Sequence, residues 1–315
     1  MIMQFIKCLK SYKKIIMYSI IIILFVLVLT RYNGSPIDDF PVDEISTLKT
    51  KFMISDVKIV TAADCRYFSG LIEFVASIHY WEPNMTVIVY DLGLQPEQKK
   101  EAESWCNVQI NALPVNTPDH IKKESRKRFS WKALVLQDAV MKYGAIFYSD
   151  AGSVIRAPLE PIKKLIIADG HFFVQGQDED TTTLLHKGMY AYFGVNVTQL
   201  KGKPSFAGSV HGYVRGGLAE KHILRPLVKC SISPECITPI GSSLRNHRFD
   251  QSALSIIIYT SGIKIQPHTE LLITSLNQLS ENPFLPSSRI IWTSRQASYS
   301  YSNQICTKKT YLDKK

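Results

Sequence analysis

The chain has 315 residues, of which 45% are hydrophobic and 20% are charged, and its formal net charge is +10. This composition is typical of a globular protein and excludes a disordered or low-complexity chain. The excess positive charge favours a polyanionic partner: a nucleic acid, an anionic membrane surface, a nucleotide diphosphate or a sulfated glycan. Charge alone does not choose among them.

An uncharged, mostly apolar run covers residues 15–30 and is slightly shorter than the ~20 residues that span an average bilayer. Four lysines precede this run: Lys7, Lys10, Lys13 and Lys14. By the positive-inside rule, residues 1–14 are a cytoplasmic tail and the remainder is lumenal. We therefore expect 15–30 to be the transmembrane signal anchor of a single-pass type II protein of the Golgi or endoplasmic reticulum membrane, followed by a stem over 31–53. A cleaved signal peptide is the alternative, but no small-x-small cleavage site follows the run.

Other features agree with a lumenal body. N-glycosylation sequons begin at Asn33, Asn84 and Asn196, and such sites are modified only on that side. Five cysteines follow the expected anchor: Cys65, Cys106, Cys230, Cys236 and Cys306. An odd number leaves at least one unpaired within the chain, and we expect Cys230 and Cys236 to form a disulfide across a short loop.

Between residues 56 and 155, short apolar runs alternate with stretches of helical periodicity. The expected strands cover 57–64, 86–91, 108–113 and 145–149, and the expected helices cover 68–80, 97–106 and 131–143. Ser130 is expected to cap the last helix, and Gly144 stands where a left-handed C-cap residue belongs. This alternation predicts an α/β fold with βαβ units and a mixed, mainly parallel twisted sheet flanked by helices.

The pattern after residue 155 is less regular. The expected strands cover 171–175, 189–195 and part of 204–217, and the expected helices cover 219–229 and 251–262. Asp178 and Glu179 belong to a polar loop, and Asp250 would cap the last helix.

Three expected strands end in an aspartate: Asp64, Asp91 and Asp150. Each could be a turn former or a helix N-cap, and for a single residue that is the better interpretation. Because ligands of open α/β sheets bind at the carboxyl ends of the strands, three aspartates at one edge predict a binding crevice there.

The order of these features resembles the GT-A type of nucleotide-sugar glycosyltransferase and is similar to the family 8 transferases. The phrases VIVYDLGL, FSWKALVLQDAV and HRFDQSAL also resemble an uncharacterised metazoan group of type II, glycosyltransferase-like membrane proteins. The likeness covers roughly residues 56–268. It implies a GT-A-like lumenal catalytic domain over 54–285, a C-terminal tail over 286–315, a nucleotide-sugar donor, and a glycan, glycoprotein or glycolipid acceptor.

The resemblance also assigns roles on the donor side. Thr61, Ala62, Ala63 and Asp64 match the segment that surrounds the nucleoside, and Asp91 would lie at the same crevice. Asp150 matches the first aspartate of the DxD signature, whose two carboxylates hold Mn²⁺ or Mg²⁺ against the diphosphate.

Here the sequence reads Asp150-Ala151-Gly152-Ser153, so the second carboxylate is missing. We leave three alternatives open: a weaker metal site, a site completed by His247 or His268, and a metal-independent reaction. In the last case Arg128 and Lys132 would neutralise the phosphates. The Arg126–Arg128 run also fits a solvated basic loop, and a lone histidine is more often a packed or surface residue.

On the acceptor side, Gly208 lies in a segment similar to the family's small-residue strand, and Asp250-Gln251 matches its Asp-Gln pair. Asp250 is our first candidate for the carboxylate that takes the acceptor proton, with Asp178 or Glu179 as the second. A catalytically inactive lumenal lectin or assembly partner is the competing hypothesis, because one metal-binding carboxylate is absent. A basic nucleic-acid binder is disfavoured, since no zinc-finger, RNA-binding or helix-turn-helix signature is present.

Overall fold

A computed structural model describes residues 52–123, 128–273, 282–293 and 301–308. All the described residues belong to one compact unit. The expected anchor over 15–30 and the sequon at Asn33 lie outside the described residues. Within the described ranges, no helix is long and apolar enough to cross a membrane.

The core of this unit is a six-stranded sheet with the order β3-β2-β1-β4-β7-β6. Its strands are β1 (Val57–Ala63), β2 (Val87–Asp91), β3 (Val108–Ala112), β4 (Ala145–Ser149), β6 (His171–Phe172) and β7 (Val210–Val214). The first four are parallel, with Ala63 opposite Asp91 and Val57 opposite Ala145, whereas β7 runs antiparallel to both β4 and β6. The mixed, mainly parallel α/β sheet predicted from the sequence is therefore confirmed.

A smaller sheet joins three short strands in the order β5-β9-β8: β5 (Val154–Ile155), β9 (Ile291–Trp292) and β8 (Leu272–Ile273). Both residues of β9 are buried, and Cys306 forms a disulfide with Cys106. The described part of 286–315, which we expected to be a tail, therefore contributes to the packed body.

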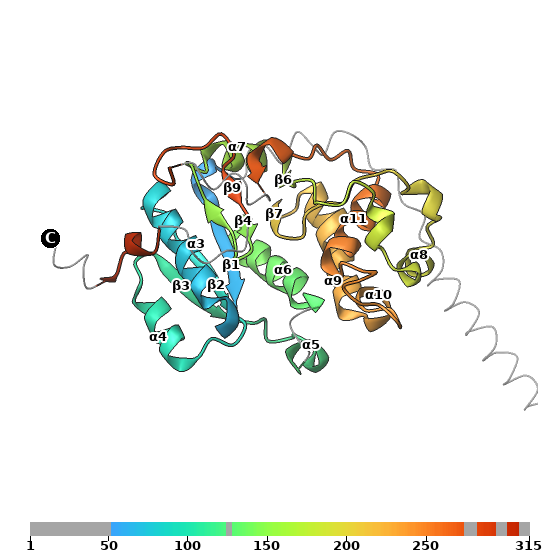
Figure 1. Cartoon of the computed structure of the whole chain (residues 1–315), viewed down its shortest axis with the longest axis horizontal. Helices are drawn as coiled ribbons and strands as arrows, with labels where there is room; N and C mark the ends of the chain where they lie inside the picture. The colour runs from blue at the N-terminus through green and yellow to red at the C-terminus, as the bar shows by residue number, and fades with distance from the viewer. Residues whose placement is uncertain (1–51, 124–127, 274–281, 294–300, 309–315) are drawn as a thin grey trace, which may run out of the picture. The chain divides into compact units, whose positions relative to one another are not determined.

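Helices cover both faces of the large sheet (Figure 1). The α-helices are α3 (Phe68–Trp81), α4 (Pro96–Ser104), α5 (Asp119–Lys123), α6 (Trp131–Tyr143), α7 (Glu160–Asp169), α8 (Lys187–Phe193), α9 (Arg225–Ile232), α10 (Pro234–Ile237) and α11 (Asp250–Thr260). Short 3₁₀ turns cover Ile54–Asp56, Cys65–Tyr67, Thr181–Leu184, Val197–Gln199, Thr269–Leu271 and Ser302–Gln304.

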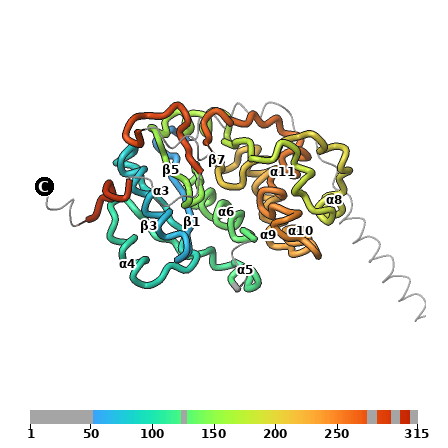
Figure 2. Tube along the Cα trace, in the orientation of Figure 1, coloured from blue at the N-terminus to red at the C-terminus, as the bar shows by residue number. Residues whose placement is uncertain are grey.

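The alternation of side chains along β1 divides the core. Val60 and Ala62 pack in the cluster shared with α6, α9 and α11, whereas Ile59 and Ala63 pack with α3 and α7 on the opposite face. Figure 2 shows α9, α10 and α11 together beside α6. The ion pair between Lys132 and Asp250 joins the first turn of α6 to the first residue of α11.

Three expectations for the second half need correction. The strand expected over 189–195 is wrong: these residues belong mainly to α8, which buries Met189 and ends at Gly194 in a left-handed conformation. The strand expected over 171–175 is shorter, because β6 covers only His171–Phe172. The helix expected over 219–229 is a π-helical turn, Glu220–Leu224, followed by α9, whose Pro226 has no backbone N–H to donate.

Two disulfides join cysteines of the described ranges. Cys230 and Cys236 are joined, as expected, and link α9 to α10. The bond between Cys106 and Cys306 spans 200 positions and was not predicted. Cys65 is the free cysteine of the described ranges.

Candidate functional site

A cleft of about 590 Å³ opens at the carboxyl ends of β1 and β4. Its walls include segments that are distant in sequence: the end of β1, the start of α6, the turn after β4, residues 176–178, the loop before β7 and the start of α11. Parallel strands bring their carboxyl ends to one edge, so this is where the fold collects polar side chains.

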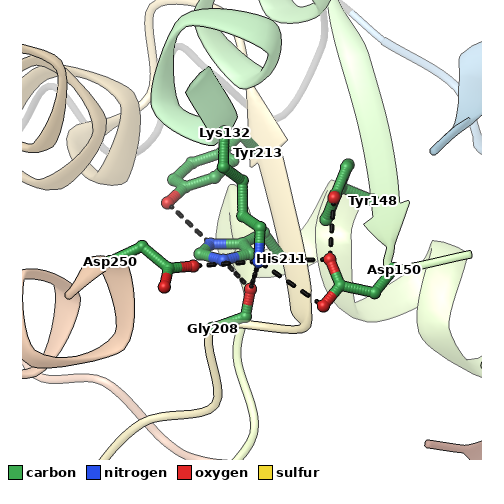
Figure 3. Close-up of polar contacts among 7 residues, drawn as sticks. All are labelled: Lys132, Tyr148, Asp150, Gly208, His211, Tyr213 and Asp250. Carbon is green, nitrogen blue, oxygen red and sulfur yellow. Dashed lines mark hydrogen bonds and ion pairs between the residues drawn. The ribbon is translucent and has the colours of Figure 1, made fainter. Parts of the chain in front are cut away.

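A buried lysine stands between two aspartates in this cleft (Figure 3). The Nζ atom of Lys132 lies 3.1 Å from Oδ1 of Asp150 and 2.9 Å from Oδ2 of Asp250. It also donates a 2.6 Å hydrogen bond to the carbonyl oxygen of Gly208. The Lys132 side chain is only 4% exposed, whereas that of Asp150 is 25% exposed and faces the opening.

The backbone around this cluster is unusual. Phe129, just before α6, and Phe249, just before α11, are non-glycine residues with positive φ angles of 57° and 47°. The sequence pattern predicts that Asp250 caps α11. This prediction is wrong, because Phe249 occupies the N-cap position and Asp250 is the first helical residue. A Cβ atom at Gly208 would lie 2.9 Å from Oδ2 of Asp250, which explains why a glycine is needed there. Strained residues at both helix starts make the cluster a candidate functional site.

Further polar groups form hydrogen bonds with residues of this cluster. The hydroxyl of Tyr148 donates a 2.8 Å hydrogen bond to Oδ1 of Asp150. The ring of His211 places Nε2 3.1 Å from the Gly208 carbonyl and Nδ1 3.2 Å from the hydroxyl of Tyr213. We assign the Nε2-protonated tautomer, in which His211 donates to the carbonyl and accepts from the tyrosine.

The charges of the cluster follow from burial. Burial, together with the positive charge of Lys132, lowers the pKa of His211 to about 3, so this imidazole is neutral near pH 7. Burial opposes the charge of Lys132, but Asp150 and Asp250 outweigh it and raise the lysine pKa. Burial raises the pKa of Asp250, although Lys132 counteracts the shift. The positive charge of this group therefore resides on Lys132.

The β1 end of the cleft holds a different ion pair. Oδ1 of Asp64 accepts a 2.9 Å hydrogen bond from the backbone N–H of Arg66, and Oδ2 lies 2.6 Å from Nη2 of the same residue. Asp64 thus caps the short turn Cys65–Tyr67 and also lines the cleft. The side chain of Arg66 is 51% exposed at the cleft.

A third polar group lies beside α11. Nε2 of Gln251 lies 3.1 Å from Oδ2 of Asp178 and 3.1 Å from Oγ of Ser205. Gly176 gives these side chains room, since a Cβ atom there would lie 2.4 Å from Oγ of Ser205. Asp178 and Gln251 both line the cleft.

The cleft collects most of the residues selected from the sequence, which are Ala62, Ala63, Asp64, Lys132, Asp150, Asp178, Gly208, Asp250 and Gln251. It does not include Thr61, Asp91, Arg128, Glu179 or His268. Sequence reasoning missed other lining residues, among them Arg66, Tyr67, Phe129, Trp131 and Arg248. These five adjoin selected residues, so extending each motif by a few positions would have found them, whereas no motif indicates Leu244 or Thr293.

Asp91 and the two histidines have local roles instead. Oδ1 of Asp91 accepts hydrogen bonds from the backbone N–H groups of Gly93 and Leu94, so it forms a turn. His268 stacks on Phe172, and its Nδ1 lies 3.1 Å from Oε1 of Glu270. His247 is buried, with Nε2 3.2 Å from the Ile237 carbonyl oxygen.

Neither histidine therefore completes a metal site with Asp150. Across the described residues, no three His, Cys, Asp or Glu side chains come together as metal ligands. The sequons at Asn84 and Asn196 are both exposed, as glycosylation requires.

No protein-family model and no curated protein sequence matches the chain. Among solved structures, it is similar to the apo bifunctional glycosyltransferase WbbM, with 10% identity, a TM-score of 0.44, and coverage of 72% of this chain and 39% of that one. It is also similar to the galactosyltransferase LgtC, solved with donor and acceptor sugar analogues. The identity is 16%, the TM-score is 0.40, and the match covers 64% of this chain and 70% of that one. A third similar structure is the glycosyltransferase GlyE of Streptococcus pneumoniae TIGR4, with 13% identity, a TM-score of 0.40, and coverage of 64% of this chain and 43% of that one. The chain spans less than half the length of WbbM and of GlyE.

Proposed function

We propose that this chain is a glycosyltransferase, which moves a sugar from a nucleotide-sugar donor to a hydroxyl of a glycan, glycoprotein or glycolipid. The observation that carries the proposal is the convergence of Asp64, Lys132, Asp150 and Asp250 on one cleft at the carboxyl edge of the sheet. The sequence resemblance assigns three of these positions to donor or acceptor contacts, and the fold brings them together although they span nearly 190 positions.

The β1 end of the cleft suits the nucleoside. Ala62 and Ala63 are small, and Asp64 offers carboxylate oxygens to a ribose or base. Tyr67, which is 47% exposed, adds aromatic surface on which a base can stack. The diphosphate would then extend towards Lys132 and Asp150.

The transfer forms a bond between the acceptor oxygen and the anomeric carbon. The bond from that carbon to the diphosphate oxygen breaks, and its electron pair leaves with the diphosphate. In an inverting reaction, the hydroxyl proton passes to a carboxylate. Asp250 suits this role because burial raises its pKa, and Asp178, held by Gln251, is the second candidate.

We further propose that the enzyme is anchored in a Golgi or endoplasmic reticulum membrane with its catalytic domain in the lumen. The apolar run over 15–30 and the exposed sequons at Asn84 and Asn196 support this location. Two disulfides add support, because such bonds persist in oxidising compartments.

The test is turnover of a panel of nucleotide sugars by the purified full-length chain, read as release of nucleoside diphosphate. At least one donor should be hydrolysed slowly, and Asp150→Ala should abolish the release while the circular dichroism spectrum stays unchanged. A folded wild-type chain that neither binds nor hydrolyses any donor would refute the proposal.

One observation favours a second candidate, a catalytically inactive lectin or assembly partner: the sequence after Asp150 lacks the second carboxylate of the DxD signature. This candidate predicts glycan binding without nucleotide dependence. Calorimetric titration with nucleotide sugars and with free glycans separates the two.

A further inference from the structure

We propose that Lys132 is the resident cation of the cleft and occupies the place between two carboxylates that a divalent metal ion would take. The inference deepens the proposed function and rests on it. Its consequence is that the chain binds the diphosphate of its donor without a divalent metal ion.

The contacts of Lys132 join three oxygen atoms to one ammonium group. The Nζ atom donates a 2.6 Å hydrogen bond to the carbonyl oxygen of Gly208 and forms ion pairs with Oδ1 of Asp150 at 3.1 Å and Oδ2 of Asp250 at 2.9 Å. These acceptors come from the end of β4, the start of α11 and the loop before β7. A single cation therefore ties together the three segments that form this end of the cleft.

The surroundings also fix the ammonium in place. The Nζ atom lies 5.1 Å from the ring centroid of Phe129, 5.8 Å from that of Trp131 and 5.8 Å from that of Tyr148. Aromatic faces attract a cation, and moving Lys132 away would leave two carboxylates unpaired, which is energetically costly. Lys132 is thus held by both electrostatic attraction and packing.

The same geometry does not fit a divalent ion. Mn²⁺ or Mg²⁺ bound to either carboxylate at about 2.1 Å would lie within a few ångströms of the ammonium, and the two positive charges would repel each other. Oδ1 of Asp150 is already contacted by Tyr148 and Lys132, and Oδ2 accepts a 3.5 Å hydrogen bond from the same ammonium. Among the described residues, no further pair of metal-ligating side chains joins Asp150.

Two arginines line the cleft and provide the remaining positive charge. Arg66 lies at the β1 end, and Arg248 lies just before α11. Guanidinium groups bind phosphate oxygens in a bidentate manner, so they suit the diphosphate better than a point charge does. In this arrangement Lys132 positions Asp150 and Asp250, and the arginines hold the phosphates.

The first arm of the test is calorimetric titration of the full-length wild type with UDP and GDP, in EDTA and in excess Mn²⁺. We expect the nucleotide that binds to do so with the same affinity in both buffers. Binding that appears only with Mn²⁺ would overturn the inference. If neither nucleotide binds in either buffer, the proposed function fails, and the second arm still tests Lys132.

The second arm measures Mn²⁺ binding without nucleotide by electron paramagnetic resonance. We expect no bound Mn²⁺ in the wild type. Lys132→Met, which removes the ammonium and leaves both carboxylates, should gain a bound Mn²⁺ signal that the further change Asp150→Asn abolishes. A wild-type signal that is lost in Asp150→Asn would overturn the inference, as would a folded Lys132→Met variant that binds no Mn²⁺.

If Lys132→Met does not fold, the wild-type result decides alone. The matched control is Lys164→Met, which removes a lysine from an exposed ion pair with Glu160 and should not change Mn²⁺ binding.

Discussion

The two ends of the cleft are built in different ways. At the β1 end, Asp64 pairs with Arg66, two positions along the chain, and the arginine side chain is half exposed. At the other end, Lys132 pairs with Asp150 and Asp250, and its side chain is 4% exposed. The first pair is formed by a local turn, whereas the second exists only when the whole sheet and α11 are in place.

This difference has energetic consequences. An exposed pair contributes little to stability because water screens it and both side chains lose freedom. Breaking a buried pair leaves an uncompensated charge away from water, which is strongly unfavourable. The β1 end can therefore change with little effect on the fold, whereas the Lys132 end couples stability to the proposed chemistry.

The largest expected effect is that of Lys132→Met. The unpaired carboxylates of Asp150 and Asp250 should lower the free energy of unfolding by about 3–5 kcal/mol, measured by urea denaturation. Any donor turnover should fall about a hundredfold, as when one preorganised donor is lost. Lys164→Met, at the exposed pair with Glu160, should leave both quantities unchanged. Equal effects of the two substitutions would remove the contrast between buried and exposed pairs.

Gly208→Ala should have the next largest effect. The added methyl group would lie 2.9 Å from Oδ2 of Asp250 and 3.3 Å from Cβ of Gln251. Overpacking of this kind should destabilise the protein by about 1–3 kcal/mol, visible as a lower midpoint in urea. If the variant is as stable as the wild type, the carboxylate is not held where the structure places it.

Acid should weaken the Lys132 end through His211. Its folded pKa of about 3 lies below the ordinary value of about 6.5, so the unfolded chain binds more protons between these pH values and stability falls as pH falls. His211 should contribute up to about 1.4 kcal/mol per pH unit to this slope. His211→Gln should reduce the slope of unfolding free energy against pH between about pH 6 and 4, the window of this titration, although not to zero.

A slope remains because burial also lowers the pKa of His247, to about 4. The control is His120→Gln, which changes an exposed histidine and should leave the slope as it is in the wild type. An unchanged slope in His211→Gln would mean that folding does not lower the pKa of His211.

Arg66→Met should have the smallest effect on stability, less than about 1 kcal/mol, because the arginine side chain is half exposed and the buried Asp64 still accepts the hydrogen bond of the residue 66 backbone N–H. Nucleoside diphosphate affinity should nevertheless fall, since the arginine faces the cleft. Calorimetry and urea denaturation separate the two effects. A large loss of stability would show that the β1 end is as dependent on its ion pair as the Lys132 end.

The sequence predicts the first half of the fold well. Continuous apolar runs before Asp64, Asp91 and Asp150 correctly place β1, β2 and β4, because a strand buried on both faces leaves a strong local signal. The aromatic-rich run that forms α8 was misread as a strand, since aromatic residues favour strands and the helix buries only Met189 among its residues.

The site is only partly predictable for a related reason. Asp150 and Lys132 could be selected from local motifs, but nothing local indicates that Lys132 Nζ lies between Asp150 and Asp250. Asp91 has the same position at a strand end as Asp150, yet it turns to the backbone of Gly93 and Leu94. Likewise, five candidate cysteines do not identify Cys306 as the partner of Cys106.

The most direct test of the account is calorimetric binding of UDP and GDP to the full-length wild type, to Asp64→Asn and to Asp150→Asn. One nucleotide spanning the cleft contacts both ends, so we predict that the wild type binds at least one of the two and that each substitution weakens this binding without unfolding the protein. Absence of binding, or binding that neither substitution changes, would contradict the assignment of this cleft as the donor site.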